Sequence, residues 1–129
     1  MKPVLLPEDA DYLARAMAQE CAEHELPYAA RVGIAAVVLN RVEDDRYPDT
    51  AAAVLSSWEE WDAWNAFDAP LTPETVPEDR EYRLCRDACR AVLDGADPTG
   101  GALHFEYLEE NVVNESPYYH VVIGNTAFW

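Results

Sequence analysis

Apolar residues recur with helical spacing in the first part of the chain and predict a helix that starts after Pro7, where proline and acidic residues favour a helix N-terminus. Glu20 lies near the middle of the same apolar stripe. A carboxyl group in such a setting has a raised pKa, because burial disfavours its charged form. The other stripe positions are Leu13, Ala16, Met17 and Cys21.

A second helix is predicted over Tyr28–Val42, directly after Pro27. Its segment Val32–Leu39 is apolar on every side, which is typical of a helix buried at the centre of a domain. A short third helix is expected over Ala51–Leu55, with Asp49 as its N-cap. The tract that follows is aromatic and irregular.

The last part of the chain changes from helical to strand-like spacing. A fourth helix is predicted between Pro77 and Asp94, with Gly95 as its C-cap. After a turn at Asp97–Gly101, strands are predicted over Ala102–Leu108 and Tyr118–Ile123. The whole pattern indicates one α+β domain over residues 1–129, mainly helical, with a small antiparallel β-sheet near the C-terminus.

The charge of the chain excludes several classes of partner. Its 129 residues carry a formal net charge of -16, which argues against nucleic acid and anionic membrane surfaces as partners. No stretch approaches the roughly 20 apolar residues that span a bilayer, so membrane insertion is not expected. No signal peptide is visible over Met1–Glu8, so either synthesis occurs without export or the sequence lacks its leader.

Cysteine and histidine spacing points away from disulfides and metals. Cys21, Cys85 and Cys89 are too few for a disulfide framework, and we expect buried, reduced thiols. The three histidines lack metal-ligand spacing, and neither a Gly-rich phosphate loop nor a serine nucleophile motif occurs. The sequence therefore predicts no metal and no cofactor.

Four short motifs occur in order along the chain. The first is Ala-Ala-Val-Val-Leu-Asn-Arg-Val over residues 35–42, followed by Tyr-Pro-Asp-Thr over 47–50. Asp-Pro-Thr-Gly-Gly spans 97–101, and the chain closes with Ile-Gly-Asn-Thr-Ala-Phe over 123–128. Each motif is weak alone, but the four in order, spanning residues 35–128, resemble the SleB-type cell-wall hydrolases, the spore-cortex-lytic family.

The resemblance implies a lysozyme-like, mostly helical domain that cleaves peptidoglycan at muramic acid, typically by lytic transglycosylation. Its partner would be the peptidoglycan glycan strand, and its place of action the cell wall or the spore. Cytoplasmic synthesis without a known export route stays open, and we expect a monomer. The sequence does not separate hydrolysis from transglycosylation.

The resemblance also implies a catalytic glutamate near the end of the first helix, and Glu20 is the best match. It would protonate the leaving glycosidic oxygen, and its carboxylate would then take the proton of the muramic acid C6 hydroxyl. That oxygen closes onto C1 and leaves a 1,6-anhydro end. Glu23 and Glu25 are rivals, because the spacing from Glu20 to Asn40 is two residues longer than is usual in the family.

Four further residues are candidates for substrate binding. Trp61 suits a sugar face, and Asp62 is a candidate polar contact or second carboxylate. His104 and Phe105 stand where the family places cleft aromatics, so His104 is expected to hydrogen-bond the sugar or Glu20. For each of these residues a structural role, as packing or as a solvated loop acid, is the competing interpretation.

The departures from the family pattern favour a second hypothesis. The usual Gly-Glu after the catalytic glutamate is absent, and Tyr107 stands where the family has asparagine after the strand aromatics. Arg31 also stands where glutamine is common, and the chain is strongly acidic. The alternative to an enzyme is a catalytically degenerate acidic relative that binds glycan or a basic protein partner. A protein of phage or mobile-element origin is a weaker third idea.

Overall fold

The computed structural model describes residues 7–23, 25–56, 80–108 and 119–129, and does not describe the side chains of residues 7–9, 19, 20, 22, 23, 52 and 56. The helices are α1 (Pro7–Glu23), α2 (Tyr28–Glu43), α3 (Ala51–Ser56) and α5 (Arg80–Leu93). The strands are β1 (Phe105–Tyr107), β2 (Val121–Ile123) and β3 (Thr126–Phe128). The expected class, mainly helical with a small antiparallel sheet near the C-terminus, is confirmed.

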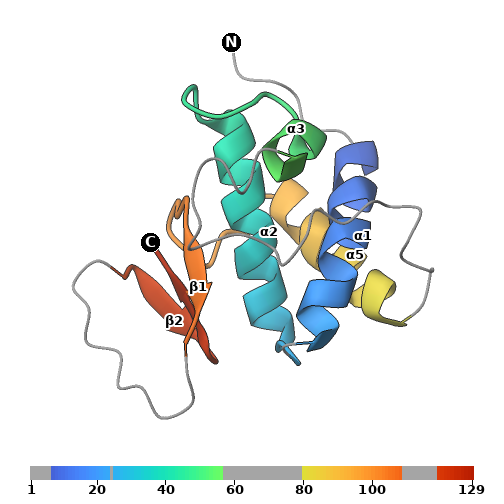
Figure 1. Ribbon diagram of the computed structural model, residues 1–129, viewed down its shortest axis with the longest axis vertical. Coiled ribbons are helices and arrows are strands. Elements are labelled where there is room, and N and C mark those ends of the chain that lie inside the picture. Colours follow the sequence, from blue (N-terminus) through green and yellow to red (C-terminus); the bar gives the residue numbers. More distant parts are fainter. Residues whose placement is uncertain (1–6, 24, 57–79, 109–118) are drawn as a thin grey trace.

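Helix α2 is the centre of the molecule, with the sheet on one side and α1 and α5 on the other (Figure 1). Every residue from Ala30 to Leu39 is buried, which confirms the central helix that the all-round apolar segment predicted. Arg41 is buried as well. The central helix therefore carries both the hydrophobic core and a buried guanidinium group.

Helices α1 and α5 pack against each other through the faces that their periodicity predicted. Leu13, Met17 and Cys21 of α1 are fully buried. From α5, Cys85 and Cys89 enter the same core. The apolar stripe on which Glu20 was placed by sequence is thus the inner face of α1.

The three cysteines are free and buried, as the sequence predicted. Hydrogen bonding to Cys85 and burial raise the pKa of the Cys21 thiol, and burial raises that of Cys89. The hydrogen bond with Cys21, followed by one from Arg31, lowers the pKa of Cys85 against the opposing effect of burial. The Arg31 guanidinium thus favours the thiolate of Cys85, whereas burial disfavours the thiolates of all three cysteines.

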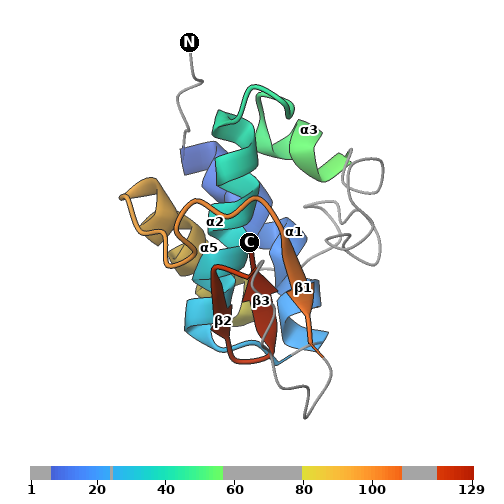
Figure 2. The ribbon, with the colours of Figure 1, turned by 90° about the vertical axis from the view of Figure 1, so that its left-hand side faces the viewer.

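The sheet contains a strand that the sequence analysis missed. Its order is β1-β3-β2, and both pairs are antiparallel (Figure 2). Strand β3 separates the two predicted strands, since Phe128 pairs with Phe105 on one side and with Val121 on the other. Gly124, with a φ of 59°, lies in the tight turn from β2 to β3.

Two helix ends test the predicted caps. The N-cap expected at Asp49 is wrong, because the hydroxyl of Thr50 accepts the backbone N–H of Ala53 at 3.1 Å. The C-cap at Gly95 is confirmed by its φ of 107° and by its N–H bond to the Val92 carbonyl. In the described part of the chain, no helix is both long and apolar enough to cross a bilayer.

Candidate active site

The last turn of α1 carries the candidate acid. Glu20 lies directly before the buried Cys21 on this helix, and the Glu20 side chain is outside the described residues. The helix end is closed by the Leu26 N–H, which donates to the Cys21 carbonyl at 3.1 Å. Glu25 adopts the left-handed conformation, with a φ of 50°, as the residue after such a helix end commonly does.

An open hollow borders the segment that follows this helix. It has a volume of about 550 Å³, within the range of small-ligand sites. Its wall combines two arginines and two glutamates with apolar and aromatic side chains. The lining residues are Glu25, Leu26, Tyr28, Arg31, Arg80, Glu81 and Leu84.

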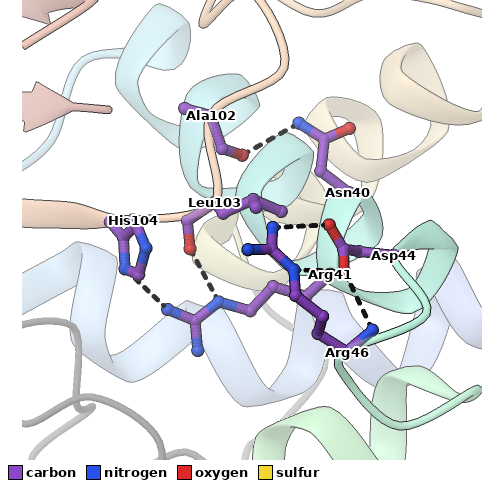
Figure 3. A network of polar contacts seen from close by, with 7 residues as sticks. All are labelled: Asn40, Arg41, Asp44, Arg46, Ala102, Leu103 and His104. Atoms are coloured by element: carbon purple, nitrogen blue, oxygen red, sulfur yellow. Dashed lines mark hydrogen bonds and ion pairs between the residues drawn. The ribbon is translucent and has the colours of Figure 1, made fainter.

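Asn40 connects α2 to the loop over residues 97–101. Its side-chain amide donates to the Ala102 carbonyl at 3.0 Å (Figure 3). It also donates to the Asp97 carboxylate at 3.2 Å. The same carboxylate accepts the Thr99 N–H at 2.8 Å, the Thr99 hydroxyl at 2.5 Å and the Gly101 N–H at 2.9 Å. Partial burial raises the pKa of Asp97, but these hydrogen bonds outweigh it and lower the pKa below the usual range.

Arg41 holds the segment that leads into β1. Its Nε donates to the Leu103 carbonyl at 2.7 Å, and its terminal nitrogen lies 3.3 Å from His104 Nδ1 (Figure 3). The guanidinium also lies over the Tyr47 ring, 4.8 Å from its centroid. Because arginine can only donate, His104 Nδ1 must accept, which places the proton of the neutral imidazole on Nε2.

His104 is half-buried and belongs to a group of aromatic rings at the sheet. Its ring stacks on Trp129, with centroids 5.5 Å apart and an interplanar angle of 19°. The Tyr119 ring lies 5.4 Å from the same indole, and its hydroxyl donates to Glu106. The backbone closes the group, since the His104 N–H donates to the Trp129 carbonyl and the Trp129 N–H to the His104 carbonyl.

A family model described as Cell Wall Hydrolase matches residues 25–129, most of the chain. The chain belongs to the Cell Wall Hydrolase family. Spore cortex-lytic enzymes from Halalkalibacterium halodurans and Oceanobacillus iheyensis are 34% and 33% identical to it over 83 and 79 residues. Each match covers 61% of this chain, but only 22% and 26% of the two relatives, so the chain spans about a quarter of their length.

Solved structures extend the similarity to the fold. The catalytic domain of the Bacillus cereus SleB protein superposes with a TM-score of 0.66 at 26% identity, covering 98% of this chain and 94% of that one. The catalytic domain of the germination-specific lytic transglycosylase SleB from Bacillus anthracis gives a TM-score of 0.62 at 23% identity, covering 99% and 98%. This Cell Wall Hydrolase chain therefore has the fold of the SleB catalytic domains.

The structure describes only two of the four substrate-binding candidates, His104 and Phe105, so it does not show whether the four lie together. Trp61 and Asp62 lie outside the described residues. Phe105 is 1% exposed and packs against Phe128 and Tyr107, which favours the packing role; its contact with substrate stays an untested prediction. His104 is accessible in part, and its contact with sugar or with Glu20 likewise stays a prediction.

Sequence reasoning missed the polar side chains that shape this region. The sequence analysis mentioned three of them, Asn40, Arg41 and Asp97, only as parts of family motifs. In the structure these residues connect α2 to the segment that carries His104. The available signal was that two polar residues end an otherwise apolar helix and that an aspartate opens a Gly-rich turn. Among the described residues, no cluster of histidine, cysteine and carboxylate side chains could hold a metal ion.

Proposed function

We propose that this chain is a peptidoglycan-cleaving enzyme of the lytic transglycosylase type, with Glu20 as its single catalytic acid. Membership of the Cell Wall Hydrolase family over residues 25–129 carries the proposed activity. Glu20 precedes the matched residues and is assigned from its position near the end of α1. The lysis of spore cortex named for the relatives, and the lytic transglycosylase activity named for the Bacillus anthracis protein, indicate the substrate class. The place of action would be the cell wall or the spore cortex.

The location of Glu20 suits this role. It lies in the last turn of a helix whose inner face is apolar, and Glu25 and Leu26, which follow that helix, border an open hollow. An acid in such a setting can stay protonated near neutral pH until it meets the glycosidic oxygen. One carboxyl group is sufficient, because the C6 hydroxyl of muramic acid replaces water as the nucleophile.

The chemistry balances with one proton shuttled by Glu20. The carboxylic acid gives its proton to the leaving oxygen while the bond from that oxygen to muramic acid C1 breaks. The carboxylate then removes the C6 hydroxyl proton as O6 bonds to C1. The products are a free 4-hydroxyl on one fragment and a 1,6-anhydromuramic end on the other, and the acid is regenerated.

Mass spectrometry of peptidoglycan fragments tests the proposal. The wild type, Glu20→Gln and the matched variant Glu23→Gln are incubated with vegetative and cortex peptidoglycan, beside an active family member. We expect anhydromuramic ends from the wild type and from Glu23→Gln, and none from Glu20→Gln. Reducing ends would mean hydrolysis and would direct attention to Asp62 as a second carboxylate.

The outcomes also separate the rival functions. If Glu23→Gln forms no product and Glu20→Gln still does, Glu23 is the catalytic acid in place of Glu20. If the wild type and both variants leave peptidoglycan intact while the control enzyme digests it, the proposed enzymatic activity is contradicted. The degenerate acidic relative that binds glycan or a basic protein would then be the better hypothesis.

A further inference from the structure

Arg31 is a buried cation that contacts three parts of the molecule. It belongs to α2 and is 4% exposed. Its Nε donates to the Leu26 carbonyl in the turn after α1, at 3.1 Å. One terminal nitrogen lies 2.7 Å from the Glu81 carboxylate and 3.4 Å from the Cys85 sulfur, both on α5. One guanidinium thus joins α2, α5 and the turn after α1.

These contacts lead to the last turn of α1. Arg31 binds the Leu26 carbonyl, and the N–H of the same Leu26 donates to the Cys21 carbonyl. Glu20 is the residue directly before Cys21. Two consecutive hydrogen bonds therefore connect the Arg31 guanidinium to the backbone beside the proposed acid.

The hollow beside the turn after α1 explains why a polar contact from Arg31 holds this turn. The turn after α1 borders the hollow of about 550 Å³, and both Arg31 and Glu81 form part of its wall. On that side the turn is therefore not held by close-packed side chains. A buried arginine is costly unless its geometry is fixed by several partners, and its rigid planar fork then fixes their relative positions in return.

We propose that Arg31, held by Glu81 and Cys85, is a positioning residue that fixes the last turn of α1 and with it the backbone of Glu20. This inference rests on the proposed function, because it assigns Arg31 a role in the same reaction. A displacement of about 1 Å between an acid and its target can cost roughly a hundredfold in rate.

The test compares Arg31→Gln, Glu81→Gln and the double variant with the wild type, using soluble glycan-strand fragments as substrate. Arg46→Gln is the control, since Arg46 forms an exposed ion pair with Asp44 at 2.9 Å on the loop after α2. We expect kcat to fall about tenfold to a hundredfold in each single variant, with KM within about twofold of the wild type. The double variant should lose little more, because the two side chains act as one unit.

A structural role alone would not give this pattern. Arg31→Lys keeps the charge but lacks the fork, so it should recover only a small part of kcat. Unchanged kcat in Arg31→Gln, or equal changes in kcat and in the amount of folded protein, would overturn the inference. Should Arg31→Gln fail to fold, Glu81→Gln alone decides, because its side chain is 30% exposed and folding depends on it less.

Hydrogen exchange separates this inference from the proposed function. Amides in the last turn of α1 should exchange faster in Arg31→Gln and Glu81→Gln than in the wild type or Arg46→Gln. Unaltered exchange would overturn the connection itself, whatever the activity. Faster exchange in a chain whose wild type cleaves nothing would overturn the proposed function, and with it the role of Arg31 in positioning the acid.

Discussion

The Phe128 ring lies directly against the backbone of Gly33, so that a β-carbon at position 33 would be 2.5 Å from the Cζ atom of the ring. Gly33 belongs to the central helix, and Phe128 closes the last family motif on β3. Both are buried, and Phe128 is fully enclosed. This contact sets how closely the sheet approaches α2.

Gly33→Ala is expected to destabilise the domain, although alanine is the better helix former by about 1 kcal/mol. The added methyl group must displace an enclosed aromatic ring, and such overpacking typically costs about 1–3 kcal/mol. Urea unfolding of the wild type and the variant measures the difference. In a Phe128→Leu background, Gly33→Ala should instead raise the free energy of unfolding, because alanine is then favoured in the helix without the clash. A loss of stability there as large as in the wild-type background would contradict the explanation.

Arg41→Met is expected to lower the free energy of unfolding by about 2–3 kcal/mol, because it removes charge-assisted hydrogen bonds from a fully buried guanidinium. The Leu103 carbonyl also loses the donor that holds the segment before β1. Chemical denaturation measures the loss. Arg46→Met, on the solvent-exposed loop, should leave the midpoint unchanged, and equal losses in both variants would contradict a specific role for Arg41.

The tautomer of His104 gives a separate test of the same contact. Since Arg41 donates to Nδ1, the neutral ring should carry its proton on Nε2. Nitrogen chemical shifts of the imidazole distinguish the two tautomers. A proton on Nδ1 in the wild type would exclude the hydrogen bond.

Glu25→Gly is expected to stabilise the chain by about 1 kcal/mol, because a residue with a β-carbon is strained in the left-handed conformation that Glu25 adopts. Glu43→Gly is the matched control: Glu43 is also exposed, but it is the last residue of α2 and should lose stability. Thermal unfolding measures the stability of both variants.

Glu25→Gly also tests Glu25 as the rival acid, since full activity of this variant would exclude that role.

The helices could be predicted because their signal is local. Burial of one helix face places apolar residues at a regular spacing that a short window of sequence reveals. This spacing is seen in α1 at Leu13, Met17 and Cys21, and the continuous apolar run of α2 is equally local. Strand β3 could not be found in this way. It has only three residues, all of them buried, so it lacks the alternation that identifies a half-exposed strand.

The sequence named candidate site residues but not the side chains that hold them, because those contacts are not local. Family motifs located Glu20 and His104 along the chain but did not say which side chains support them. Asn40 and Asp97 are 57 residues apart, and only the folded chain reveals that they are hydrogen-bonded. The Arg31 contacts were equally hidden, because they join α2 to a turn and to another helix.

Asp97 should make stability depend on pH at the acid end of the range. Its folded-state pKa lies below its usual value of about 3.9, so the unfolded chain takes up a proton first as the pH falls. The contribution of Asp97 is therefore complete above about pH 5, and it is lost between the unfolded-state pKa and the lower folded-state pKa.

Asp97→Ala is expected to cost about 1–2 kcal/mol at neutral pH, because the N–H groups of Thr99 and Gly101 and the Asn40 amide lose their acceptor in a loop that solvent reaches in part. It should also flatten the fall in stability below pH 4. The measurement is the free energy of unfolding from pH 7 to pH 3, with Asp94→Ala, an exposed aspartate just after α5, as the control. An acid-end slope that is the same in the wild type and in Asp97→Ala would show that other carboxylates govern it.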